Sequence, residues 1–290
     1  MNSRRTFIKN AGMAAAGALL FPSFAHAFAK VKPVGLQLYT LREVIGKDPK
    51  GVIEKIAKAG YKEVETYGYS AKGGYFGMDA KAFKGLLDAN GLKAPSGHFG
   101  LDSFLKDGNQ DELKIAIEGA NGLKMEFLTI PWMGESLRSS LDDYKKVSER
   151  LNQAAEICKK SGLKLAYHNH DFEFKKYDGK TGYEVMLAET DKNLVKFEMD
   201  LYWVVRSGND PIAFFNKYPG RFPMWHVKDM DKANHTINTE VGTGTIDFKS
   251  FFKHAKQAGL KYAIVEQENF SKDPFISIKQ SFDYVSRELV

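Results

Sequence analysis

The sequence is poor in cysteine and has no long internal run of apolar residues. Its 290 residues include only Cys158, so the chain can form neither an internal disulfide nor a thiolate metal site. Beyond residue 27 we find no Pro/Gly/Ser-rich linker, block of like charge or apolar stretch long enough to span a bilayer. With 43% hydrophobic and 27% charged residues, the composition excludes a disordered chain and a small disulfide scaffold. One soluble globular domain is the simplest expectation.

An excess of charge of one sign is also nearly absent. The formal net charge is +6, but three of the basic residues, Arg4, Arg5 and Lys9, lie in an N-terminal segment that contains no acid. Without that segment the net charge is +3. A nearly balanced chain offers no electrostatic footprint for nucleic acid or for an acidic membrane, so we expect neither as a partner.

The N-terminal segment has the order of an export signal. A short charged stretch with paired arginines, Ser3–Lys9, precedes an apolar stretch from Ala11 to Phe21 and an Ala25-His26-Ala27 cleavage site. The paired arginines favour the twin-arginine route. We therefore expect residues 1–27 to be a signal peptide, residues 28–290 to form one catalytic domain, and the protein to be periplasmic.

Short β-rich runs alternate with helical patterns along the rest of the chain. The expected strands are Val34–Tyr39, Glu63–Tyr67, Lys93–His98, Phe127–Ile130, Lys164–His168, Val195–Asp200, Pro223–Val227 and Tyr262–Glu266. Helical periodicity is clear at Lys50–Ala59, Leu141–Lys160 and Phe248–Ala258. Glycines typical of helix ends recur at positions 60, 91, 122, 162 and 259.

Repeated strand–helix units predict an α/β fold of the (β/α)8 TIM-barrel type. A doubly wound sheet is disfavoured because no G-x-G-x-x-G follows the first strand.

Titratable side chains gather at the ends of the expected strands, which is where a TIM barrel places its chemistry. Of the six histidines beyond residue 27, four fall at such ends: His98, His168, His170 and His226. Asp200 and Glu266 accompany them. Imidazole and carboxylate groups without cysteine suit one divalent ion such as Mn²⁺, Zn²⁺, Co²⁺ or Mg²⁺. A hydrogen-bonded polar network without metal is the alternative interpretation.

Four motifs resemble those of the sugar phosphate isomerase/epimerase family, within the xylose isomerase-like barrels. They are His168-x-His170-Asp171-Phe172-Glu173-Phe174, Asp200-Leu201-Tyr202-Trp203, His226-Val227-Lys228-Asp229 and Val265-Glu266. The resemblance extends over essentially the whole chain beyond the leader. It implies one divalent metal ion, held by acidic and histidine residues from strands five to eight, and a sugar substrate.

Carried over by position, the resemblance makes Asp200, His226 and Glu266 metal ligands. The fifth strand departs from the pattern, because His168 stands where many relatives have a glutamate and the nearest acid is Glu173. His168, His170 and Glu173 therefore all stay open as further ligands, with Glu173 the acidic choice. Trp203 also replaces a histidine that epimerases often carry three residues after this aspartate, which leans away from simple epimerisation.

The resemblance implies proton abstraction next to a sugar carbonyl, through an enediolate. Glu266 or Glu173 would act as base, with His168 or His170 as its partner. Lys228 would hold a sugar oxygen or, alternatively, pair with Glu198 or Asp229. The residues expected to contact the substrate are Gln37, Tyr39, Glu65, His98 and Trp203.

The enediolate has two fates, and they define the competing functions. Reprotonation gives a keto-sugar isomerase or epimerase, which we favour at family level. Expulsion of a β-substituent gives a lyase that cleaves 3-keto-glycosides, which is the alternative. A non-enzymatic exported sugar-binding protein is a further candidate, and a homo-oligomer is compatible with the sequence. A phosphodiesterase on the same barrel would need several metal ions and a basic groove, which six histidines and a charge of +3 do not support.

Overall fold

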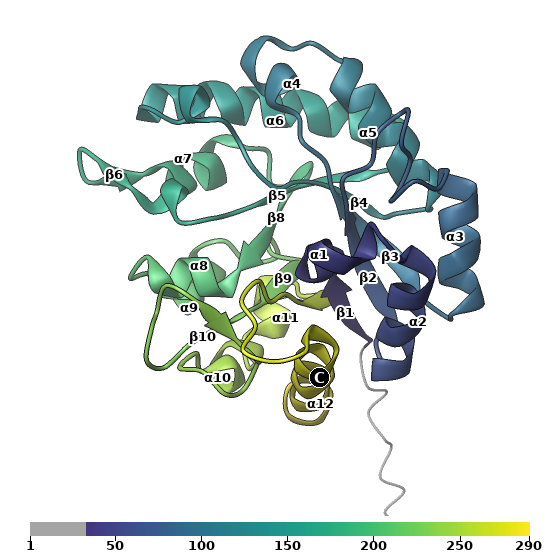
Figure 1. Ribbon diagram of the computed structural model, residues 1–290. Coiled ribbons are helices and arrows are strands. Elements are labelled where there is room, and N and C mark those ends of the chain that lie inside the picture. Colours follow the sequence, from purple (N-terminus) through teal and green to yellow (C-terminus); the bar gives the residue numbers. More distant parts are fainter. Residues whose placement is uncertain (1–32) are drawn as a thin grey trace, which may run out of the picture. The chain divides into compact units, whose positions relative to one another are not determined.

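The computed structural model describes residues 33–290, and the expected export signal lies outside them. Eight parallel strands close into a barrel in the order β1-β12-β9-β8-β5-β4-β3-β2. Their bounds are β1 Val34–Gln37, β2 Glu63–Tyr67, β3 Lys93–His98, β4 Phe127–Ile130, β5 Lys164–His168, β8 Val195–Asp200, β9 Met224–Val227 and β12 Tyr262–Val265. Figure 1 shows these strands at the centre with helices around them. The expected TIM barrel is confirmed.

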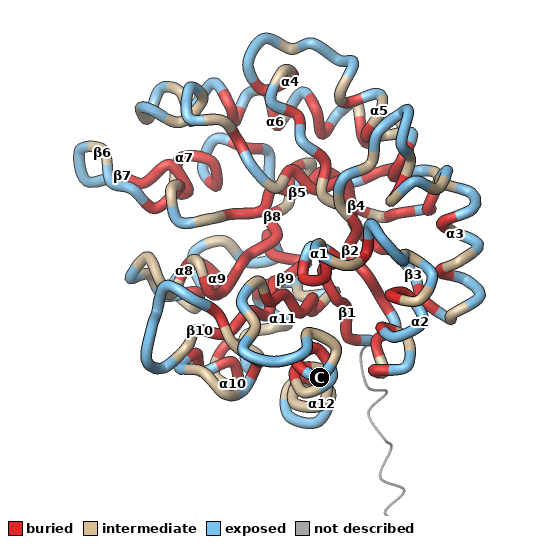
Figure 2. Tube along the Cα trace, in the orientation of Figure 1, coloured by how far each residue is buried: buried red, intermediate tan, exposed pale blue. Residues whose placement is uncertain are grey.

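The barrel strands are buried almost throughout, as parallel strands covered by helices must be. In Figure 2 they form the buried centre, and most exposed residues lie on the surrounding helices and loops. The expected first strand is too long at its C-terminal end, because residues Leu38–Leu41 form a 3-10 helix, η1. The Gln37 side chain caps this helix by accepting a hydrogen bond from the Tyr39 N–H at 2.9 Å.

Helices follow the strands and cover the outside of the barrel. The longer ones are α2 Pro49–Ala59, α3 Ala80–Ala89, α5 Asp111–Gly122, α6 Leu141–Lys160 and α12 Pro274–Glu288. The shorter ones are α1 Arg42–Ile45, α4 Asp102–Asp107, α7 Gly182–Glu189, α8 Leu201–Arg206, α9 Pro211–Lys217, α10 Phe248–Phe252 and α11 Ala255–Ala258. Two further 3-10 helices are η2 Glu135–Leu137 and η3 Phe172–Phe174. No described helix is both long and apolar enough to cross a membrane.

Two expectations about the helices need correction. The single helix expected at Phe248–Ala258 is interrupted at Lys253–His254, and so becomes α10 and α11. Gly122 does not end its helix in the left-handed conformation; that conformation falls to Lys124, with φ 57°. Gly60 behaves as expected, since its φ of 113° closes α2 where a side chain would be strained.

Two small antiparallel ladders lie in the loops after strands β5 and β9. One joins β6 Lys176–Tyr177 to β7 Lys180–Thr181, and the other joins β10 Asp229–Met230 to β11 Asn238–Thr239. The second loop is fixed by Asp229, whose carboxylate accepts hydrogen bonds from the N–H groups of Met230, Gly242, Gly244 and Ile246. Asp229 is thus committed to the loop, while Lys228 beside it is buried in the barrel.

Candidate functional site

A cavity of about 430 Å³ opens at the C-terminal ends of the barrel strands. Its wall includes Tyr39, Tyr67, His98, Trp132, His168, His170, Glu266 and Glu268. A second cavity, of about 400 Å³, lies at the strand starts and is lined by Glu63, Lys93, Glu126 and Tyr262, among others. We place the candidate site in the first cavity, because the strand-end histidines converge there and the loops of a TIM barrel carry its chemistry.

Asp200, His226 and Glu266 meet beside this cavity and are called the acid-rich group below. His226 Nδ1 lies 3.1 Å from Glu266 Oε2 and 3.9 Å from Asp200 Oδ2. All three side chains are buried, and one ligand atom of each lies within 4.8 Å of the others. They come from the ends of β8, β9 and β12, so the convergence that the sequence predicts for these residues is present.

The position of Asp200 follows from its place at the junction of β8 and α8. Its Oδ1 caps the helix by accepting a hydrogen bond from the backbone N–H of Trp203 at 3.0 Å. Its Oδ2 faces the acid-rich group and has no hydrogen-bond partner among the described residues. Burial raises the pKa of this carboxyl to about 6. A buried carboxylate oxygen without a partner is costly, and a cation would satisfy it.

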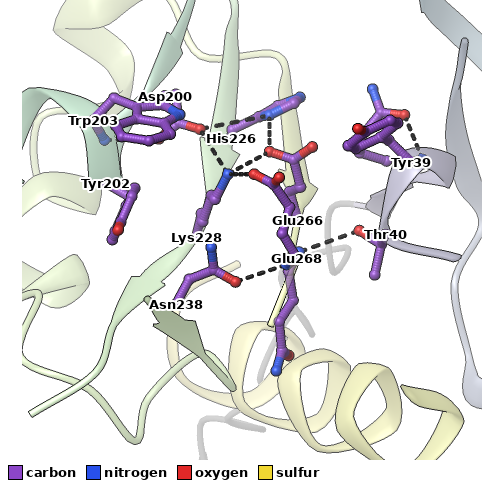
Figure 3. A network of polar contacts seen from close by, with 12 residues as sticks. Tyr39, Thr40, Asp200, Tyr202, Trp203, His226, Lys228, Asn238, Glu266 and Glu268 are labelled. Atoms are coloured by element: carbon purple, nitrogen blue, oxygen red, sulfur yellow. Dashed lines mark hydrogen bonds and ion pairs between the residues drawn. The ribbon is translucent and has the colours of Figure 1, made fainter. Parts of the chain in front are cut away.

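Lys228 is fully buried beside the same carboxylates (Figure 3). Its Nζ lies 3.1 Å from Glu266 Oε2 and 3.9 Å from Asp200 Oδ2, and it also donates to Glu268. Burial opposes its charge, but the carboxylates of Glu266 and Asp200 outweigh burial and raise the pKa of Lys228. Burial likewise opposes ionisation of Glu266, but Lys228 and His226 hold its pKa well below the usual range. Lys228 therefore pairs with Glu266 and Glu268, which follow β12, rather than with Glu198 or Asp229.

His98, His168, Glu198 and His226 form a second candidate cluster, the histidine-rich group. Glu198 Oε2 lies 2.8 Å from His98 Nε2, 3.1 Å from His168 Nδ1 and 3.3 Å from His226 Nε2. Burial and the neighbouring Glu65 carboxylate raise the pKa of Glu198 to about 7. Burial opposes protonation of His98, but Glu65 and Glu198 outweigh it and raise its pKa to about 9.

The structure separates Glu173 from both groups. Its Oε1 accepts a hydrogen bond from the Tyr167 hydroxyl at 2.6 Å, and its Oε2 accepts one from the backbone N–H of His170 at 2.9 Å. Burial raises the pKa of Glu173 to about 7. Both oxygens are thus used in holding the turn after β5, which explains why Glu173 does not join the candidate metal ligands. His168 belongs to the histidine-rich group and is therefore better placed than Glu173 to bind a metal ion.

His170 lies in the cavity wall among aromatic rings. Its ring stacks on Phe172 at 5.7 Å between centroids and is 5.2 Å from Trp132 and 5.6 Å from Trp203. Its Nδ1 is buried and has no hydrogen-bond partner among the described residues. Burial, followed by the charge of Lys228, lowers the pKa of His170 to about 3, so its imidazole is neutral.

The residues expected to contact the substrate fall into two sets. Tyr39 and His98 line the cavity. Gln37 and Glu65 are completely buried beneath it, where the Gln37 side-chain N–H donates to Glu65 Oε2 at 2.8 Å. Trp203 packs 5.3 Å from Lys228 Nζ rather than in the cavity wall. Direct contact with a ligand is thus open to Tyr39 and His98, whereas Gln37 and Glu65 support the histidines.

Sequence reasoning missed one central residue, Glu198, which it treated only as a possible partner of Lys228. The available signal was its spacing, since Glu198 precedes Asp200 by two residues on one strand and so points to the same side.

The donors present fit a divalent ion. The acid-rich group offers two carboxylates and an imidazole, and Asp200 Oδ2 is buried without a partner among the described residues. Such a mixed oxygen and nitrogen set suits Mn²⁺, Zn²⁺ or Co²⁺, and Mg²⁺ less well because it prefers oxygen ligands. The identity of the metal ion is left open by this set.

Comparison with known proteins identifies the family. Residues 53–287 match the model of the xylose isomerase-like TIM barrel. This chain belongs to the xylose isomerase-like TIM barrel family. An inosose dehydratase from Clostridium beijerinckii is 24% identical to it over 269 residues, which cover 81% of this chain and 85% of the relative.

Two solved structures from Parabacteroides distasonis are similar over nearly their whole length. One, a sugar phosphate isomerase/epimerase, has 29% identity and a TM-score of 0.78, and the match covers 91% of this chain and 97% of that one. The other, of the same description, has 30% identity and a TM-score of 0.75, with 88% and 98% covered. Proteins similar to this chain thus include ones named for dehydration of an inosose and for isomerisation or epimerisation of sugar phosphates.

Proposed function

We propose that this protein is a divalent-metal-dependent enzyme that removes a proton next to the carbonyl of a keto sugar. The observation that carries the proposal is the convergence of Asp200, His226 and Glu266 beside a cavity walled by further imidazoles. The ligands we propose are these three residues. A sugar-binding protein without catalysis would need stacking surfaces but no such buried cluster, and the relatives support a sugar-acting enzyme.

A divalent cation bound there would polarise the substrate carbonyl and favour the negative charge that develops when the neighbouring proton leaves. The residues of the chain supply the rest. Lys228 compensates the charge of Glu266, and its burial keeps water from that ion pair. Trp132 is 44% exposed at the cavity and offers a ring face on which a sugar can pack.

Two imidazoles in the cavity wall are placed to act on a substrate, one as a base and one as a charged group. His170 is our candidate base, because its ring lines the cavity and its imidazole is neutral. His98 contributes positive charge at the cavity, because Nε2 lies 2.8 Å from Glu198 Oε2 and 3.1 Å from Glu65 Oε2, contacts that favour a protonated ring. General acid–base catalysis by such groups contributes about 10²–10⁴-fold to rate.

Elimination of a β-substituent is the fate we place first. It is supported by the inosose dehydratases, which match this chain over most of their length, and by the departures at His168 and Trp203 from the epimerase pattern. The substrate would then be a keto sugar or a 3-keto-glycoside. Isomerisation or epimerisation is the second candidate, favoured by the names of the Parabacteroides distasonis structures.

Product analysis in deuterated water tests both fates. The Mn²⁺-loaded protein is incubated with free ketoses, inososes and 3-keto-glycosides, and the products are read by mass spectrometry. Elimination gives a product whose mass is lower by that of water or of the aglycone. Isomerisation gives an isomer of the substrate whose mass is higher by one unit, because one proton is replaced by a deuteron. Asp200→Asn, treated identically, is the control. No change in any substrate would contradict the proposal.

We also propose that the chain is exported through its N-terminal segment. Support comes from the sequence alone, in the paired Arg4-Arg5 and the Ala25-His26-Ala27 site. Replacing both arginines by lysine should keep the protein in the cytoplasm of its host, as measured by fractionation. Unchanged periplasmic recovery would contradict the twin-arginine route.

A further inference from the structure

The two nitrogens of His226 face two different sets of carboxylates. Nδ1 faces the acid-rich group, 3.1 Å from Glu266 Oε2. Nε2 lies 2.7 Å from Glu65 Oε2 and 3.3 Å from Glu198 Oε2. All four of these side chains are 7% exposed or less. The ring is therefore held on both edges, and only one edge points to the proposed metal site.

Glu65 and Glu198 contact the same two imidazoles in the barrel interior. Their strands, β2 and β8, are four positions apart in the closed ring of eight, and so are the strands of His98 and His226, β3 and β9. The four side chains form an alternating square, since His98 Nε2 also contacts both carboxylates, at 3.1 Å from Glu65 and 2.8 Å from Glu198. Without the imidazoles between them, these two buried carboxylates would repel each other.

Hydrogen-bond chemistry then fixes where His226 keeps its proton. Ionised carboxylates only accept hydrogen bonds, and a neutral imidazole has one N–H donor and one lone pair. Carboxylates face both nitrogens, so a cation bound by the acid-rich group would take the place of a proton at Nδ1. The one remaining proton of the ring then lies on Nε2, between Glu65 and Glu198. Gln37, which donates to Glu65 Oε2 at 2.8 Å, holds that carboxylate in place.

We propose that Glu65 and Glu198 are positioning residues that orient His226 and select its Nδ1 as the metal-binding nitrogen. The inference rests on the proposed function only in requiring that a cation binds the acid-rich group. It gives a role to three buried polar residues, Gln37, Glu65 and Glu198, that make no contact with the cavity. Carboxylates behind a metal-binding histidine typically contribute 10–100-fold to metal affinity.

Metal titration of isosteric variants is the first test. We expect Glu65→Gln and Glu198→Gln to bind Mn²⁺ about 10–100-fold more weakly than the parent, at unchanged stoichiometry. Glu63→Gln is the matched control, because Glu63 lies two residues away on the same strand but lines the cavity at the opposite end of the barrel. Its affinity should equal that of the parent. Equal affinity in all three variants would overturn the inference.

Nitrogen NMR of the parent protein is the second test and needs no variant to fold. In protein loaded with diamagnetic Zn²⁺ and labelled with ¹⁵N-histidine, His226 should carry its proton on Nε2. A proton on Nδ1 would overturn the inference, because the cation would then lie in the histidine-rich group.

The pattern across variants separates this inference from the proposed function. Loss of Mn²⁺ binding in Glu198→Gln but retention in Asp200→Asn would make Glu198 a metal ligand and overturn the positioning role. Weakened binding in the two glutamine variants, together with inactivity of the parent on every keto sugar, would leave the inference standing and remove the proposed function.

Discussion

Lys228 and Glu266 form a buried ion pair inside the barrel, with Nζ 3.1 Å from Oε2 (Figure 3). The same Glu266 oxygen lies 3.1 Å from His226 Nδ1, the nitrogen that we propose for metal binding. Lys228 thus supplies positive charge to the acid-rich group in the cation-free protein. A divalent ion bound there would share these carboxylates with the ammonium group.

Lys228→Met should destabilise the cation-free protein and make it dependent on metal. Removing one partner of a buried ion pair leaves the carboxylates uncompensated, which costs about 3–5 kcal/mol. Added Mn²⁺ should therefore raise the melting temperature of this variant more than that of the parent. Thermal unfolding with and without Mn²⁺ measures both effects. Lys249→Met is the control, because its pair with Glu288 is exposed and contributes about 0–1 kcal/mol. Equal responses in the two variants would contradict the shared-carboxylate account.

Asp200→Asn should lose the metal and keep the fold. Asparagine caps a helix as well as aspartate, so the contact to the Trp203 N–H survives, but the charge facing His226 is gone. We expect metal affinity to fall by more than about 100-fold, since an outer carboxylate alone contributes up to that much. Elemental analysis and circular dichroism provide the measurements. Asp210→Asn, which caps α9 away from the site, should keep its metal. Full occupancy in Asp200→Asn would show that the ligands are misassigned.

Stability of the cation-free protein should fall as the pH rises from 6 to 9. Asp200, Glu198 and His98 have pKa values raised by the fold to about 6, 7 and 9, from ordinary values of 3.8, 4.5 and 6.5. The folded state therefore binds more protons than the unfolded state in this range. The His98 contribution, at most about 3 kcal/mol, is complete below pH 6.5 and is lost through about pH 9.

Urea unfolding at several pH values measures this dependence, and His98→Gln should flatten its alkaline part. Saturating Mn²⁺ should reduce the slope, because metal binding replaces the protons. A flat profile in the parent would argue against charged His98 in the folded protein.

His170→Ala should lower turnover while leaving metal content unchanged. The imidazole lines the cavity and is our candidate base, so its loss should reduce kcat by about 10²–10⁴-fold. His235→Ala, at an exposed loop position, is the matched control and should be fully active. Steady-state kinetics on whichever keto sugar is turned over, with elemental analysis alongside, checks the split. An unchanged kcat in His170→Ala would show that another residue removes the proton.

The barrel could be predicted because its signals are local. Alternating strand and helix patterns place β2, β3, β4, β5 and β8 at the observed residues, since periodicity and glycine punctuation act within each unit. The break at Lys253–His254 could not be predicted, because the helical periodicity of the sequence continues through it. The left-handed conformation of Lys124 could not be predicted either, because the nearby Gly122 is the residue type that commonly takes that conformation.

The site was predictable to the extent that strand ends reveal it. Asp200, His226 and Glu266 converge because each lies at or next to the C-terminal end of a barrel strand, and the sequence pattern shows where these ends fall. The separation of Glu173 depends on Tyr167 and on the turn after β5, contacts that no spacing encodes. The square of Glu65, His98, Glu198 and His226 depends on which strands oppose each other in the closed ring, and this appears only in three dimensions.

Anomalous diffraction from crystals soaked in Mn²⁺ tests the central claim most directly. We predict one strong peak per chain, in contact with Asp200, Glu266 and Nδ1 of His226. A peak elsewhere in the barrel, or no peak at saturating Mn²⁺, would contradict the assignment of this cluster as the metal centre.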